Sequence, residues 1–122
     1  MDTHSDIQRF EVGPRMSNAV VHGGIVYLAG VVAADATQDV KGQTTQILAS
    51  IDRLLAGAGT DKSRLLRANI WLTDISTFAQ MNEAWDAWVV PGCTPARATV
   101  ESKLAGAGLQ VEIQVIAATT RA

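Results

Sequence analysis

The chain has 122 residues, of which 48% are hydrophobic and 18% are charged, and its formal net charge is −2 at pH 7. This length and balance predict one domain with a core large enough to need no disulfide or structural metal, and they exclude a disordered chain. A pI of about 5.5 offers no basic surface for nucleic acid.

The same balance favours a homo-oligomer, since a monomer of this size has few charges with which to cover its apolar residues. The single cysteine, Cys93, cannot form an internal disulfide, which favours the reducing cytoplasm. No signal-peptide pattern opens the chain, and no apolar run approaches the roughly 20 residues that span a bilayer. We therefore expect a cytoplasmic protein that binds neither membrane nor nucleic acid.

The first third of the chain is predicted to be β-structure. Residues 1–8 are mostly polar and are expected to be flexible, and a short strand over 9–12 ends at Gly13-Pro14. Two β-rich runs, 19–22 and 25–30, then flank a Gly-Gly pair, which is typical of a tight hairpin.

Residues 33–41 are expected to form a loop, after which Thr44 and Thr45 are candidate caps of a first helix. The apolar positions of this helix recur with a period of 3.6 residues. They are Ile47, Leu48, Ile51, Leu54, Leu55 and Ala58. Gly57 and Gly59 lie where the helix is expected to end.

From residue 65 to 73 the pattern changes to a period of two, which predicts a strand. One face carries Leu66, Ala68, Ile70 and Leu72; the other carries Arg67, Asn69, Trp71 and Thr73. A second helix should follow, with Asp74 and Ser76 as caps. Its apolar stripe is Phe78, Met81, Trp85, Trp88 and Val89.

Two strands complete the chain, over 96–101 and 110–118, separated by a glycine-containing loop. The resulting order predicts an α+β fold in which both helices cover one face of a sheet. Trp71 and Ile116 would lie on the other face. Apolar residues on an uncovered sheet face favour a protein partner, which strengthens the expectation of an oligomer.

Several classes of site find no support in the sequence. The two histidines, His4 and His22, and the single Cys93 provide no metal-ligand spacing, no Cys–His pair and no Ser–His–acid set. No glycine-rich phosphate loop with its lysine occurs. We therefore expect no metal and no nucleotide cofactor.

Three polar residues stand at unusual positions. Arg97 lies in a strand of small residues, Glu112 lies between Val111 and Ile113, and Asn82 falls on the apolar stripe of the second helix. Each has an ordinary explanation: Arg97 in a surface ion pair, Glu112 as a solvated residue, Asn82 as a partner of backbone groups. The alternative is that all three converge on one cleft.

Motifs along most of the chain resemble the RidA (YjgF) family of reactive intermediate deaminases. They are Gly13-Pro14; Val26-Tyr27-Leu28-Ala29-Gly30; Gln43 with Gln46; Ala58-Gly59; Asp74, Phe78 and Asn82; Pro95-Ala96-Arg97; and Val111-Glu112-Ile113 with Ala117.

The resemblance implies a chorismate-mutase-like (ferredoxin-like) fold over 1–122, with two helices packed on one face of a mixed sheet and a homotrimer around the other. It also implies hydrolysis of reactive 2-imino or 2-enamino acids, released by pyridoxal-phosphate enzymes that it does not bind stably, to 2-keto acids and ammonia. The reaction requires no cofactor. Arg97 would hold the substrate carboxylate and Glu112 would position the water, with Gly30 and Asn82 as further substrate-binding residues.

Some positions depart from the family pattern. Arg15 stands where well-studied members have Tyr, Ala29 where Ser is common, Thr99 where Cys is frequent, and Gln114 at a second acidic position. Arg15, Ala29 and Thr99 are candidate substrate-binding residues, and a second cation at Arg15 would admit a dicarboxylate or a bulkier substrate. Two other functions stay open: a non-catalytic trimer that binds small carboxylates, and a ribonuclease.

Overall fold

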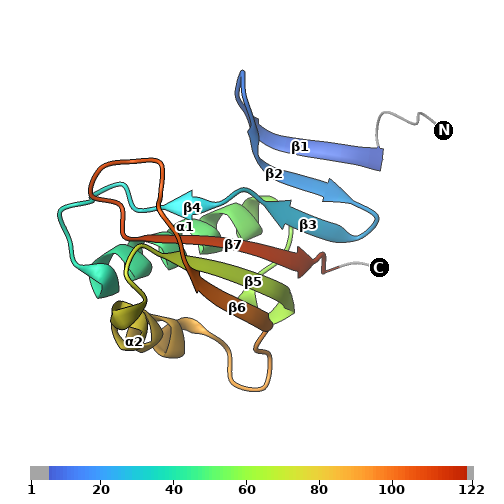
Figure 1. The fold of residues 1–122 in the computed structure, drawn as a ribbon. Helices are drawn as coiled ribbons and strands as arrows, with labels where there is room; N and C mark the ends of the chain where they lie inside the picture. Colours follow the sequence, from blue (N-terminus) through green and yellow to red (C-terminus); the bar gives the residue numbers. More distant parts are fainter. Residues whose placement is uncertain (1–5, 121–122) are drawn as a thin grey trace.

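The computed structural model describes residues 6–120, which form a mixed seven-stranded sheet with two long helices (Figure 1). The strands are β1 (Ile7–Val12), β2 (Ser17–His22), β3 (Ile25–Leu28), β4 (Val31–Val32), β5 (Leu65–Leu72), β6 (Ala96–Glu101) and β7 (Val111–Ala118). The helices are α1 (Val40–Gly57) and α2 (Phe78–Trp88), and the short 3-10 turns η2 (Lys62–Arg64) and η3 (Ile75–Thr77) precede β5 and α2.

The strand order is β1-β2-β3-β7-β5-β6, and β4 pairs with β7 beyond the end of β3. Neighbouring strands are antiparallel except β5 and β6, which are parallel. A parallel pair needs a crossover, and α2 supplies it. Strand β6 and strand β1 therefore form the two outer edges of the sheet.

The core lies between the two helices and one face of the sheet. Alternate residues of β7, Val111, Ile113 and Val115, are completely buried, as the period-two pattern predicts. They join one cluster with Ile47 of α1 and Met81 of α2. The expected α+β fold with both helices on one face is confirmed. In residues 6–120, no helix is long and apolar enough to cross a membrane.

The hairpin of β2 and β3 is confirmed, with Gly23 and Gly24 at φ values of 59° and 79°. Both central residues of such a turn need a positive φ, which glycine adopts without a steric penalty. The first strand differs from the expectation. We expected residues 1–8 to be flexible, yet Ile7 and Gln8 pair with His22 and Val21, because β2 extends far enough to form hydrogen bonds with them. Residues 1–5 lie outside the described part of the chain.

The start of α1 also differs. The helix begins at Val40 with Asp39 as its cap, whose side chain accepts a hydrogen bond from Gly42 N at 2.8 Å. Thr44 and Thr45, the expected caps, lie inside the first turns and donate back to the carbonyls of residues 40 and 41. Hydroxyl groups make this i−4 bond within helices, so threonine alone does not mark a helix start.

The expected face of Leu66 was wrong. A bulge between Leu65 and Arg67 places one extra residue in β5, so that Leu65 is buried and Leu66 is exposed. A one-residue slip reverses the faces of a strand, and the alternation resumes correctly from Ala68 onward.

The sheet face opposite the helices is partly apolar. Trp71 and Ile116 lie on it half-buried, as predicted, and Ile116 faces the exposed Tyr27 across the β3–β7 pair. We call this surface the open face.

Candidate functional site

Arg97 lies on β6, an outer edge of the sheet, and its neighbours fix the direction of its side chain. In the parallel pair with β5, Arg97 is aligned with Ala68, which is completely buried beneath the helices. Aligned residues of neighbouring strands point to the same face of a sheet. Arg97 therefore lies on the helix-covered face.

Helix α2 surrounds the guanidinium of Arg97 with three residues. Asn82 Oδ1 accepts a hydrogen bond from Arg97 Nη1 at 2.8 Å. The rings of Phe78 and Trp85 lie 5.6 and 5.3 Å from the guanidinium carbon. Residues 78, 82 and 85 are spaced by four and three positions and so share one face of a helix. Both rings make cation–π contacts with the guanidinium, and these contacts orient it.

The environment of Arg97 is also electrostatically unusual. Partial burial lowers the pKa of its guanidinium, and the nearby carboxylate of Asp86 acts in the opposite direction. An arginine remains a cation at neutral pH even so. No carboxylate of residues 6–120 forms an ion pair with it, so Asp86 compensates its charge only from beyond ion-pair distance.

Thr99 lies two residues beyond Arg97 on the same face of β6. Its Oγ1 is buried and has no hydrogen-bond partner in residues 6–120. In this rotamer the hydroxyl does not reach the surface, so a contact of this side chain with substrate would require rotation about χ1.

Glu112 lies on the open face. It is aligned with Trp71 of β5 and with Val32 of β4, while its neighbours Val111 and Ile113 are buried on the helix side. A side chain at position 30 would overlap the Glu112 carboxylate, so Gly30 leaves the space that this carboxylate occupies. Ala29 precedes it, with its N–H donating to Asn18 O at 3.0 Å.

One of the alternatives left open by the sequence was that three polar residues converge on one cleft. Asn82 and Arg97 are in contact, whereas Glu112 points from the opposite face of the same sheet. Within one chain, therefore, only two of the three come together. The alternation of β6 and β7 predicts two faces for each strand, but only the strand register shows which face of β6 and which face of β7 lie on the same side of the sheet.

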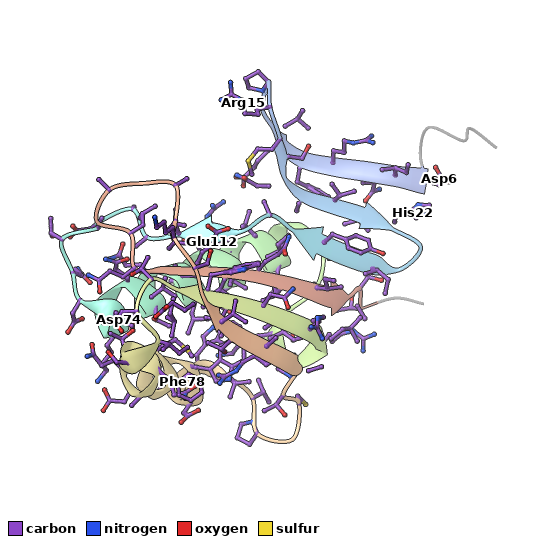
Figure 2. The ribbon with its side chains drawn as sticks, in the orientation of Figure 1. Asp6, Arg15, His22, Asp74, Phe78 and Glu112 are labelled. Atoms are coloured by element: carbon purple, nitrogen blue, oxygen red, sulfur yellow. The ribbon has the colours of Figure 1, made fainter. Side chains whose placement is uncertain are left out.

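Arg15 lies in the turn between β1 and β2 and is exposed. Figure 2 shows this turn standing away from the body of the sheet, far from Phe78 and closer to Glu112. Among residues 6–120, Arg15 has no hydrogen bond or ion pair. One chain therefore does not bring Arg15 to Arg97.

Within the described range, no group of three or more His, Cys, Asp or Glu residues has metal-binding geometry. His22 ends β2 beside the Gly-Gly turn, with Nδ1 3.1 Å from the carbonyl oxygen of Asp6. His4 lies outside the described residues. Cys93 is a half-buried loop thiol.

The aromatic contacts of Arg97 were not anticipated. Phe78 and Trp85 were assigned to the core stripe of α2, yet Phe78 is 41% exposed, and Trp85, though buried, is also in contact with the guanidinium. A signal was available, because Phe78, Asn82 and Trp85 share one helix face. The sequence does not say what this helix face contacts, because that depends on the packing of α2 against β6.

Comparisons with known proteins agree over almost the whole described chain. The sequence model of a family described as Endoribonuclease L-PSP matches residues 7–119. A RutC family protein of Haemophilus ducreyi is 43% identical over 112 residues, covering 92% of this chain and 96% of the relative. RutC family protein YoaB of Escherichia coli is 43% identical over 115 residues, with coverages of 92% and 97%. The crystal structure of a YjgF family member from Neisseria meningitidis has a TM-score of 0.93 at 44% identity and covers 98% of this chain and 99% of its own.

Proposed function

Because this chain belongs to the RidA (YjgF, RutC) family, we propose that it hydrolyses reactive 2-imino or 2-enamino acids to 2-keto acids and ammonia. The observation that carries the proposal is Arg97, a half-buried guanidinium that α2 orients and that forms no ion pair with a carboxylate of residues 6–120. Its planar fork matches the carboxylate that every 2-imino acid carries.

In the proposed reaction Glu112 provides the proton transfer. The protonated C=N carbon of the substrate is already electrophilic, so positioned water can add to it without a cofactor. A C–O bond forms as Glu112 accepts a proton from the water, and the proton then passes to the nitrogen. The C–N bond then breaks and ammonia leaves, while Glu112 takes the hydroxyl proton and passes it to solvent, which gives the C=O group of the 2-keto acid.

The positions of Arg97 and Glu112 on opposite faces support a site shared between copies of the chain. A homotrimer built around the open face would bring Glu112 of one copy to the Arg97 edge of the next. Trp71, Tyr27 and Ile116 supply the apolar surface that such a contact would bury. We place this trimer in the cytoplasm, where pyridoxal-phosphate enzymes release the imines as free intermediates.

Two alternatives remain in the same family. A non-catalytic trimer would bind 2-keto acids in calorimetry without accelerating imine hydrolysis. The family model is described as an endoribonuclease, but a net charge of −2 and only two histidines give weak support to binding and cleaving RNA. Ribonuclease activity that survives stringent repurification and is lost with Arg97 would favour that function.

The decisive experiment is Arg97→Ala, assayed on 2-iminopropanoate generated in situ. Removing a bidentate, charge-assisted contact should lower kcat/KM about 100-fold or more. Arg64→Ala is the matched control, since Arg64 is an exposed arginine that donates to the carbonyl of Thr119 at 2.8 Å. Equal activity of the wild type and Arg97→Ala, with the oligomer intact, would rule out the proposed anchor.

A further inference from the structure

Arg15 is placed and surrounded like a residue that meets another copy of the chain. It lies at the end of the β1–β2 hairpin between Val12 and Met16, whose exposed fractions are 67% and 53%. Two large apolar side chains with this exposure at a protruding turn favour a contact surface. Arg15 itself has no hydrogen bond or ion pair among residues 6–120, so its charge is available to a partner or a ligand.

The strand directions put Arg15 at the same end of the sheet as Glu112. Strand β2 is antiparallel to β3, and β3 is antiparallel to β7, so β2 and β7 run in the same direction. Ser17, which follows the turn, and Val111, which precedes Glu112, therefore start their strands at one end. In Figure 2 both Arg15 and Glu112 lie on the side of the molecule away from Asp6 and His22.

Arg97 belongs to the other edge of the sheet. Strand β6 is the outer strand there, whereas β1 is the outer strand on the Arg15 side. The β6–α2 edge also exposes apolar side chains: Ile75, Phe78 and Val100 are 44%, 41% and 49% exposed. Two different apolar surfaces at opposite edges of one chain suit a head-to-tail contact, which closes into a ring when the rotation permits.

We propose that the shared site carries two guanidinium groups, Arg97 of one copy and Arg15 of its neighbour, and that its substrates are 2-imino dicarboxylates. This inference rests on the proposed function and deepens it. Arg97 holds the carboxylate next to the imine carbon, and Arg15 holds the carboxylate at the far end of the substrate. Glu112, from the same copy as Arg15, acts on the carbon between them.

The charges of the site agree with this substrate class. Two guanidinium groups and the Glu112 carboxylate would face one cleft, so a doubly charged substrate gains two charge-assisted contacts where a singly charged one gains one. A monocarboxylate makes no contact with the Arg15 guanidinium, so it lacks one of the two charge-assisted contacts. The hydrolysis is unchanged: water adds to the imine carbon and ammonia leaves.

The test compares 2-iminoglutarate and 2-iminopropanoate, each generated in situ by an amino acid oxidase, in the wild type and in Arg15→Gln. We expect Arg15→Gln to lose about 10- to 100-fold in kcat/KM on 2-iminoglutarate, because one charge-assisted contact is removed. On 2-iminopropanoate its activity should change less than about threefold. The matched control is Arg9→Gln, an exposed arginine on β1 of the same hairpin, which should behave as the wild type.

Equal losses on both substrates, or a wild type that does not prefer the dicarboxylate, would overturn the inference. In that case Arg15 does not hold a second substrate carboxylate, and equal losses would point to a role in the subunit contact. Failure of the proposed function is a different result, since the wild type would then hydrolyse neither imine. Calorimetry separates the two, with 2-oxoglutarate binding more tightly than pyruvate and losing that advantage in Arg15→Gln. Equal binding of both keto acids would contradict the inference even without catalysis.

Discussion

At the scale of single residues, the proposed role of Arg97 as a carboxylate anchor depends on its contact with Asn82. A surface arginine typically pairs with a carboxylate, which neutralises it and leaves it mobile. Here the hydrogen-bond partner is an amide, which orients the guanidinium by its Oδ1 atom and adds no negative charge to that of the nearby Asp86. The remaining donors of the guanidinium are available to a ligand.

This arrangement predicts that the conservative change Asn82→Asp is worse than Asn82→Ala. Loss of one hydrogen bond to a charged group in Asn82→Ala should raise KM for 2-iminopropanoate about 10-fold. Asn82→Asp keeps the shape but places a carboxylate against Arg97, which would compete with the substrate and cost a further factor of about 10. Steady-state kinetics of the two variants checks the order, and an Asp variant more active than the Ala variant would contradict it.

Sequence reasoning singled out these candidate residues and failed for their arrangement within one chain. Asn82 stands out because it is polar on the apolar stripe of the second helix, Arg97 because it lies among small residues, and Glu112 because it lies between two apolar residues. Their relative placement depends on the register of β6 against β5, a contact between distant parts of the chain. The bulge at Leu65 shows the same limit, because Leu65 and Leu66 are equally suited to burial and only the pairing with β7 selects one.

At the scale of elements, the segment from η3 to α2 carries Asn82 and the aromatic residues that contact Arg97, and its start depends on Asp74. We expected Asp74 to cap the second helix itself; it caps η3, whose last turn leads directly into α2. Asp74 Oδ1 accepts hydrogen bonds from Ser76 Oγ at 2.7 Å and from Ser76 N at 2.9 Å. These two bonds, the side-chain one more strongly, lower the pKa of Asp74 below its ordinary value.

The sign of this shift gives a pH dependence. Because the pKa of Asp74 is lower in the folded than in the unfolded chain, its contribution to stability is complete above the unfolded value of about 4. It is lost as pH falls through the folded pKa. Asp74→Asn should therefore be less stable than the wild type at pH 7, and the difference should diminish on acidification to pH 3. Urea unfolding followed by tryptophan fluorescence measures this, and a pH-independent difference would contradict it.

At the scale of the whole molecule, the sheet separates the two halves of the proposed site, which a single chain does not unite. The helix-covered edge presents Arg97 with Asn82, and the open face presents Glu112 beside Gly30. Composition predicted that a partner covers the open face, since Trp71 and Ile116 were expected on it. The partition of the polar residues between the two faces was not predictable, because it requires the three-dimensional register of three strands.

This partition of Arg97 and Glu112 between two faces allows a complementation experiment with two purified variants. If each site draws Arg97 from one copy and Glu112 from another, two inactive variants can complement each other. Arg97→Ala and Glu112→Gln, unfolded together at equal amounts and refolded, should regain activity at roughly a quarter of the sites through random mixing in closed rings. The separately refolded variants mixed afterwards should stay inactive until subunits exchange. Complementation of this kind would make the exchange rate of subunits directly measurable as the return of activity.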